Sequence, residues 1–111
     1  MIKNKEKVKY IEMYPKARCF CPIGKAWYTN RFKVSVLPRD CYFDYLDVEK
    51  FIKEEIEGKS LTIEGACKKL YDYLKKDVED IQVESHVNDA THFPVKVLIN
   101  YEGDINKESN N

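Results

Sequence analysis

The sequence has no surplus of charge of either sign, because 19 Lys and Arg residues balance 19 Asp and Glu residues among its 111 residues. Proteins dedicated to nucleic acid usually carry a basic excess on one face, so we expect no direct nucleic-acid binding. The chain also lacks any hydrophobic run near the roughly 18 residues that a membrane-spanning helix needs, so we expect no membrane partner. No apolar stretch follows the charged residues at its start, so we expect no secretory signal and a cytoplasmic location.

Histidine is scarce, and the cysteines lack the spacing of a metal site. Two histidines are too few for sites built on several imidazoles. Only one residue separates the cysteines of Cys19-Phe20-Cys21, whereas structural zinc sites favour two to four, and no second pair follows. We therefore expect no metal. In a cytosolic chain the four cysteines are expected to be free thiols: Cys19, Cys21, Cys41 and Cys67.

The composition is that of one folded domain. Hydrophobic residues make up 43% and charged residues 34% of the chain, which is enough to build a core. A chain of this length is too short for two ordinary domains, and so small a core is only marginally stable by itself. We expect a Lys-rich N-terminal arm over residues 1–15, one domain over residues 16–102 and a flexible polar tail over residues 103–111.

Alternation of apolar and polar residues predicts four strands. The first two, residues 32–36 and 41–45, flank the turn residues Pro38-Arg39-Asp40 and are predicted to form a hairpin. The same two-residue period returns over residues 81–86 and 95–100, which flank a second turn. The sequence therefore predicts two hairpins, one near each end of the domain.

Between these hairpins the period of the apolar residues becomes helical. Asp47 is placed to cap the first helix and Gly58 to end it, while Thr62 is placed to cap the second helix. The predicted buried faces are Val48, Phe51, Ile52 and Ile56 on the first helix, and Ile63, Ala66, Cys67, Leu70 and Leu74 on the second.

The order strand, strand, helix, helix, strand, strand predicts an α+β fold. Two hairpins can join into a four-stranded antiparallel sheet with both helices on one face. Residues 17–21 lie between two prolines and are predicted to be extended or turning. The outer strands of such a sheet leave backbone groups unpaired, so we expect the chain to form a homo-oligomer through these edges.

Two stretches of the sequence resemble a known family. The first runs from Cys21-Pro22-Ile23-Gly24-Lys25 to Val36-Leu37-Pro38 and is followed by Cys41. The second is the string Glu64-Gly65-Ala66-Cys67-Lys68-Lys69-Leu70-Tyr71-Asp72-Tyr73-Leu74. Together with the ββααββ order, they resemble the QueF nitrile reductases of the tunnelling fold. The members of that fold bind purine-like or pterin-like rings at subunit interfaces.

The resemblance implies a reaction and two site residues. The family reduces the nitrile of 7-cyano-7-deazaguanine with NADPH, a step towards queuosine in tRNA. By position, Cys21 would add to the nitrile as a thioimide and Glu64 would hold the base of a deazapurine-like ligand. The residue types suit these roles, because a thiolate is a strong nucleophile and a carboxylate accepts hydrogen bonds from a ring edge.

The sequence departs from the family pattern at four places. Tyr28 stands where the family has its proton-donating aspartate, and Ile63 replaces the histidine beside Glu64. Residues Phe43–Val48 replace the run that binds the nicotinamide cofactor, and Asp89–Phe93 occupies the region of a late Arg-Gly-Gly. NADPH is therefore a cofactor by resemblance only, and we expect it to bind weakly or not at all.

The residues by themselves leave alternatives open. Cys21 is either a nucleophile or a structural thiol, and Glu64 is either a ligand or an acid that favours a helix dipole. Tyr28 either donates a proton or packs against other side chains. Glu84 either anchors the ring of a ligand or lies on a solvated face of the sheet. His92 is expected to be a loop residue. Two functions remain. The chain is either an enzyme that forms a thioimide and then transfers hydride or ammonia to it, or a non-catalytic ligand-binding or assembly module.

Overall fold

The computed structural model describes residues 1–100, so residues 101–102 of the predicted domain and the predicted tail lie outside the described part. No helix in residues 1–100 has the length and apolar character to cross a bilayer. The described elements follow in the order β1 (Ile2–Lys3), β2 (Ile11–Met13), β3 (Lys16–Cys21), β4 (Ala26–Val36), β5 (Cys41–Tyr42), α1 (Tyr45–Glu55), α2 (Ile63–Lys75), β6 (Ile81–Val87) and β7 (Val95–Asn100).

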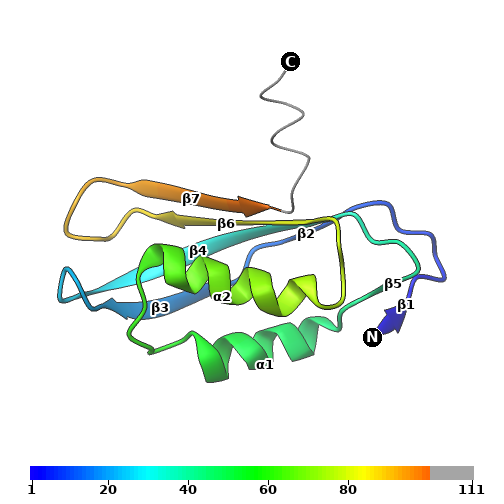
Figure 1. Cartoon of the computed structure of the whole chain (residues 1–111), viewed down its shortest axis with the longest axis horizontal. Helices are drawn as coiled ribbons and strands as arrows, with labels where there is room; N and C mark the ends of the chain where they lie inside the picture. Colours follow the sequence, from blue (N-terminus) through cyan, green and yellow to red (C-terminus); the bar gives the residue numbers. More distant parts are fainter. Residues whose placement is uncertain (101–111) are drawn as a thin grey trace, which may run out of the picture.

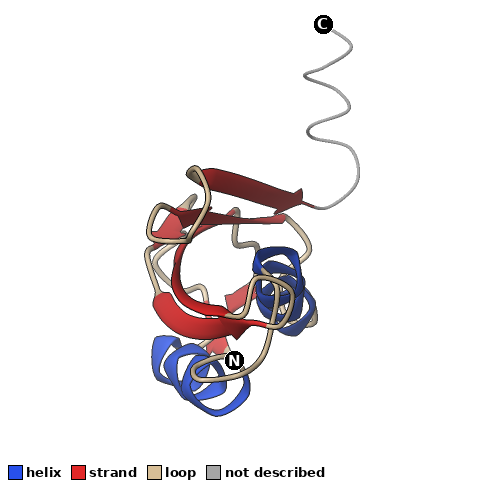
Figure 2. Cartoon of the chain, turned by 90° about the vertical axis from the view of Figure 1, so that its left-hand side faces the viewer, coloured by secondary structure: helices blue, strands red, loops and turns tan. Residues whose placement is uncertain are grey.

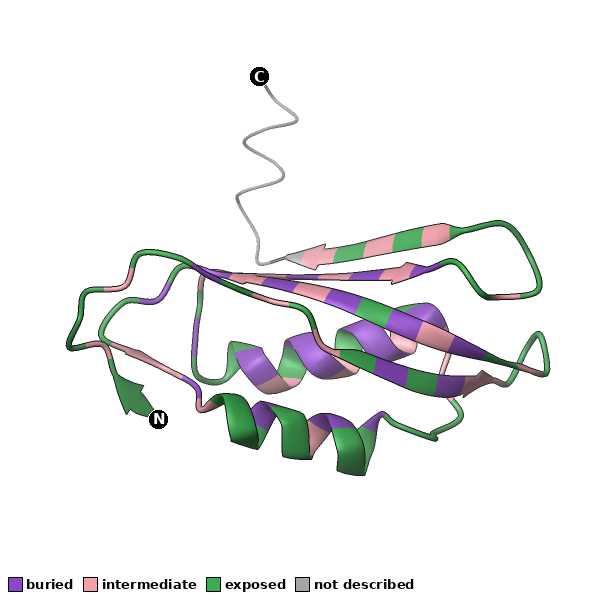
Figure 3. Ribbon diagram, turned by 180° about the vertical axis from the view of Figure 1, so that it is seen from behind, coloured by how far each residue is buried: buried purple, intermediate pink, exposed green. Residues whose placement is uncertain are grey.

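The main sheet is antiparallel, and both helices lie on the same side of it (Figures 1 and 3). The predicted α+β fold is confirmed. The sheet has five strands and not four, in the order β2-β4-β6-β7, with β3 also pairing with β4. The long strand β4 makes this possible, because residues 26–31 pair with β3 and residues 34–36 pair with β2. Seen end-on, the sheet curls around α2 (Figure 2).

The first predicted hairpin is wrong. Residues 32–36 do not pair with residues 41–45; their antiparallel neighbours are β2 and β6. The hairpin is instead formed by β3 and β4, and Cys41–Tyr42 pairs with Ile2–Lys3 in a separate two-stranded sheet. The alternation of apolar residues specifies which face of a strand is buried and not which strand lies beside it. It therefore could not identify the partner of residues 32–36.

The extra strand comes from the segment that the sequence predicted to be an arm. Ile11–Met13 pairs with β4 in register with Val34–Val36, and the Ile11 side chain is only 8% exposed. Asn4 holds the preceding loop, because its side chain donates to the Val8 carbonyl at 3.0 Å and accepts from the Val8 N–H at 2.9 Å. The segment is short and Lys-rich, so it gives little strand signal of its own.

Both helices form where predicted, but the first begins earlier. Asp44 and not Asp47 is its N-cap, accepting the Leu46 N–H at 2.8 Å, because Tyr45 is already helical. Thr62 caps α2 as predicted and accepts the Gly65 N–H at 3.0 Å. Phe51 of α1 stacks on Tyr73 of α2 with ring centroids 3.9 Å apart, which joins the two helices.

The core lies between α2 and the sheet. The predicted face of α2 is buried and packs on β6, β7 and β4. Opposite it, alternate residues of β4 and β6 are buried, as the banded strands of Figure 3 show. Two polar side chains share this core: the Ser85 hydroxyl donates to the side-chain Oδ1 of Asn30 at 2.9 Å, and both residues are fully buried.

Candidate functional site

Cys21 ends β3 at the tight turn that leads into β4. The Lys25 N–H donates to the Cys21 carbonyl at 2.8 Å, and Lys25 adopts a positive φ of 56° to close the turn. The Gly24 N–H points at the Cys21 Sγ, 3.3 Å away. The turn therefore holds the Cys21 sulfur in one place and beside a hydrogen-bond donor.

The Cys21 side chain is partly buried and lines a cavity of about 30 Å³. A water molecule needs about 10–15 Å³ of such space, so the cavity has room for a small linear group and not for a fused ring. Within one chain, a ring attached to that group has to lie outside the cavity. The lining residues are Cys21, Gly24, Ala26, Trp27, Tyr28, Ile63, Ala90, Thr91 and His92.

Tyr28 lies in this lining, but its hydroxyl is engaged elsewhere. The hydroxyl donates to the Leu61 carbonyl at 2.5 Å, and the residue is 2% exposed. Burial raises the pKa of Tyr28 above its ordinary value. The structure places Tyr28 and Cys21 in the lining of one cavity, with the Tyr28 proton directed at the backbone that precedes α2.

The remaining cysteines differ from Cys21. Burial raises the pKa of Cys19 to about 11 and that of Cys67 to about 12, and each donates to a backbone carbonyl. Cys41 is partly buried in β5, beside β1, at the other end of the molecule from the Cys21 turn (Figure 1). Among the four thiols, Cys21 alone combines partial exposure with the turn and its N–H donor.

His92 and Thr91 join the cavity although the sequence predicted only a loop there. The loop between β6 and β7 returns to the β3–β4 turn because the Asp89 carboxylate accepts the Thr29 N–H at 2.9 Å. The Nδ1 atom of His92 lies 2.7 Å from the Phe93 carbonyl, which leaves Nε2 as the second polar atom of the ring. A histidine near the turn after a predicted strand was the only sequence signal for this contact.

The two predicted ligand carboxylates lie outside the cavity. Glu64 is exposed in the first turn of α2, and its neighbour Ile63 reaches the lining in its place. Glu84 lies on the face of the sheet that the helices do not cover, with its carboxylate 3.9 Å from the Lys96 ammonium. Cys21 points to the helix-covered face, so one chain does not bring Glu84 and Cys21 together.

Residues Phe43–Val48, which replace the family's nicotinamide-binding run, lead into α1 and form its first turn. Phe43 and Val48 are buried, and Asp44 is the N-cap, so the polar side chains that remain are few. Over residues 1–100, no group of three histidine, cysteine or acidic residues is arranged to hold a metal ion.

No family model matches the chain, and no curated protein matches it in sequence. Among solved structures, the crystal structure of the archaeosine synthase QueF-Like in the apo form is similar, with a TM-score of 0.77. The match covers 87% of this chain and 97% of that chain, at 17% sequence identity. The chain has the QueF-like fold. The expected tunnelling fold is therefore confirmed, and at this identity the likeness concerns the fold alone.

Proposed function

We propose that the chain carries out thioimide chemistry on the nitrile of a deazapurine-like ligand, with Cys21 as the nucleophile. The observation that carries the proposal is the Cys21 turn: a partly exposed thiol, a backbone N–H at 3.3 Å from the sulfur, and a cavity the size of a nitrile. The likeness of the fold to that of the archaeosine synthase QueF-Like supports the proposal.

The first step forms one bond. The Cys21 sulfur adds to the nitrile carbon, and the nitrile nitrogen takes up a proton to give a thioimide. The Gly24 N–H lies 3.3 Å from this sulfur and holds it at the mouth of the turn. His92 carries the only imidazole or carboxyl group among the residues that line the cavity and would supply the proton, because the Tyr28 hydroxyl faces the Leu61 carbonyl.

Two continuations follow from a thioimide. Hydride transfer from NADPH would reduce it towards the amine, whereas attack by ammonia would break the C–S bond, release the thiol and leave an amidine. We favour ammonia, because Phe43–Val48 lacks the side chains of the family's nicotinamide run. The structural neighbour is also named as a synthase and not as a reductase.

The test is to mix the protein with 7-cyano-7-deazaguanine and to record the absorbance band of a thioimide together with the intact mass. We expect a band and a one-ligand adduct with the natural sequence and with Cys41→Ala, and neither with Cys21→Ala. Ammonium salt or NADPH is then added, and the product is identified by mass. An adduct that persists in Cys21→Ala would disprove the assignment of the nucleophile.

A binding module without catalysis is the second candidate, and the placement of Tyr28 favours it. A tyrosine whose pKa is raised and whose proton is committed to a carbonyl is a poor substitute for a carboxylic acid. Calorimetry with the same ligand separates the candidates, because binding without a covalent adduct would support the module.

A further inference from the structure

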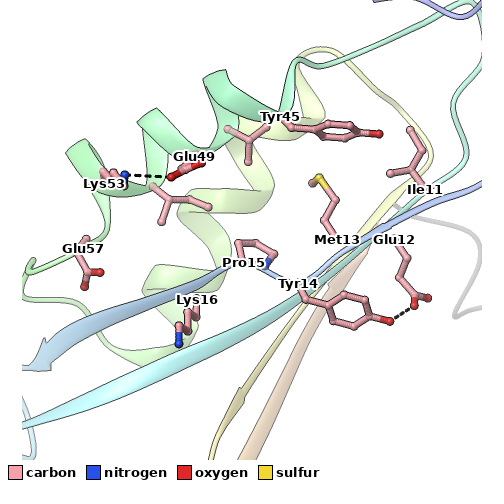
Figure 4. Close-up of a pocket in the computed structure, with 12 residues that line it drawn as sticks. Ile11, Glu12, Met13, Tyr14, Pro15, Lys16, Tyr45, Glu49, Lys53 and Glu57 are labelled. Carbon is pink, nitrogen blue, oxygen red and sulfur yellow. Dashed lines mark hydrogen bonds and ion pairs between the residues drawn. The ribbon is translucent and has the colours of Figure 1, made fainter.

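Two hollows in the described part of the chain have the volume of a ligand site, which is roughly 300–1,000 Å³. The first, of about 640 Å³, lies between α1 and the segment that runs from β2 into β3, and Met13 and Pro15 project towards the helix there (Figure 4). The second, of about 820 Å³, lies between residues 3–9 and residues 38–40, at the end of the molecule opposite the Cys21 turn (Figure 1). The lining of the first is mainly apolar, whereas that of the second is basic.

Four lysines line the second hollow, which we call the lysine hollow: Lys3, Lys5, Lys7 and Lys9. They are all the lysines of the first nine residues, whereas Glu6, the acidic residue among them, is not part of the lining. Among the described residues, no ion pair involves any of these four lysines. The hollow therefore gathers positive charge that the described part of the chain leaves without ion-pair partners.

The loop that carries these lysines is held in one conformation by Asn4. The Asn4 side chain donates to the Val8 carbonyl at 3.0 Å and to the Arg39 carbonyl at 2.8 Å, and it accepts the Val8 N–H at 2.9 Å. The Asn4 N–H also donates to the Asp40 carbonyl at 2.8 Å. These bonds join the two sides of the hollow. They use no lysine ammonium group, so all four ammonium groups stay available to a ligand.

Lys7 has a backbone conformation that lysine rarely adopts. Its φ is 55°, in the left-handed region where Gly, Asn and Asp are the usual residues. Residues in such conformations persist only where the surrounding structure holds them, and they cluster at binding sites. The loop therefore keeps a positive charge at a position where the backbone by itself favours a different residue.

The guanidinium group at the edge of the hollow is already engaged. The Nε and Nη2 atoms of Arg39 donate to the Asp80 carboxylate at 3.2 and 3.0 Å. A guanidinium held in this way does not present its fork to a ligand carboxylate. Recognition in the hollow is left to ammonium groups, which bind phosphate oxygens as point charges and need no fixed geometry.

A neighbouring hollow of opposite character limits the size of the ligand. It shares Arg39 and Asp40 with the lysine hollow, and its lining includes the carboxylates of Asp77 and Glu79. A polyanion longer than the lysine hollow would lie against these carboxylates, and like charges repel. The charge pattern therefore favours a ligand that is small and densely charged over an extended polymer.

We propose that the lysine hollow binds a small molecule that carries several linked phosphates, such as a triphosphate chain. Four ammonium groups call for several negative charges within a short distance, which a chain of linked phosphates supplies and a single carboxylate does not. Val8 and Pro38 add apolar surface to the lining, beside which a group attached to the phosphates would lie. The site is independent of the nitrile chemistry proposed for Cys21, because the two lie at opposite ends of the molecule (Figure 1).

Calorimetry at low salt with inorganic tripolyphosphate tests the charge chemistry. We expect saturable binding of tripolyphosphate, much weaker binding of orthophosphate, and loss of affinity at high salt, because salt screens exposed charges. The double variant Lys5→Gln/Lys7→Asn should bind about tenfold more weakly, and asparagine suits the left-handed backbone at position 7. The matched control Lys50→Gln/Lys68→Gln makes the same change in net charge on the two helices and should bind like the natural sequence.

A second pair of measurements tests the shape of the site and the source of the phosphates. Asn4→Ala keeps every lysine and removes the side chain that orders the loop, so it should weaken binding at unchanged net charge; a thermal melt verifies that each variant is folded. A nucleoside triphosphate that binds more tightly than tripolyphosphate would assign the nucleoside to Val8 and Pro38, and equal or weaker binding would assign recognition to the phosphates alone.

Three results would overturn the proposal. The first is the absence of saturable tripolyphosphate binding. The second is an affinity that Lys5→Gln/Lys7→Asn or Asn4→Ala leaves unchanged, since the charges in an ordered loop would then have no part in it. The third is tighter binding of a single-stranded RNA of equal charge, which would show that the surface prefers an extended polymer.

Discussion

Cys19 and Cys21 lie two residues apart on the same strand and the same face, yet their surroundings differ. Cys19 is fully buried, donates to the Ile56 carbonyl at 3.2 Å and receives the Asn30 amide at 3.3 Å. Cys21 is partly exposed and receives the Gly24 N–H. The end of α1 covers the Cys19 thiol, whereas the Cys21 thiol lies at the turn between β3 and β4 and is partly exposed. The exposure of a thiol on this strand is therefore set by what covers the strand and not by the strand itself.

Alkylation should separate the two thiols most strongly. At pH values below both pKa values, a pKa of about 11 for Cys19 lowers its thiolate fraction about 100-fold relative to an ordinary thiol of pKa 9.0. Burial slows its reaction further. We expect limiting iodoacetamide to label Cys21 before Cys19 and Cys67, as measured by peptide mass spectrometry. Early labelling of Cys19 would show that the cover over β3 opens readily.

Replacement of a thiol by alanine should cost more stability at Cys19 than at Cys21, the reverse of the order expected for alkylation. Cys19→Ala leaves the Asn30 amide and the Ile56 carbonyl without their sulfur partner, so we expect a loss of about 1–3 kcal/mol in the free energy of unfolding. Cys21→Ala, on a partly exposed turn, should cost about 0.5 kcal/mol or less. Urea unfolding measures both variants, and equal losses would contradict the comparison.

Alkaline pH should destabilise the fold through the buried thiols. The pKa values of Cys19 and Cys67 are raised by folding, so the folded state holds these protons more tightly than the unfolded state. Their contribution is complete below about pH 9 and is lost as the pH rises through about 11 and 12. We expect the slope of stability against pH above 9, measured by urea unfolding at a series of pH values, to be shallower in Cys19→Ala than in the natural sequence. Equal slopes would contradict the raised pKa of Cys19.

The smallest expected effect concerns the groups around Cys21. If His92 supplies the proton to the nitrile nitrogen, His92→Gln should slow thioimide formation severalfold. Stopped-flow absorbance measures the rate, and His86→Gln on the opposite face of the sheet is the matched control. Equal rates in both variants would leave His92 without a role in the reaction.

Local signals in the sequence were sufficient for α2 and the last two strands. Thr62 caps the helix through its own hydroxyl, and a strict two-residue period marks residues 81–86 and 95–100. The start of α1 was missed because Asp44 and Asp47 are equally good caps by residue type. β2 was missed because it has three residues and follows a Lys-rich stretch, and β3 was missed because it lies between prolines. Their strand character depends on pairing with β4.

The sequence by itself determined the α+β class and the free thiols, since these follow from periodicity and composition. The role of Cys21 stays a prediction. Only the tertiary structure decided which strands pair, that His92 reaches the Cys21 cavity, and that Glu84 lies on the other face. The physical reason is that a strand's pattern specifies which face is buried but not which strand lies beside it. Contacts between distant segments decide that, and they also decide which of two neighbouring thiols is covered.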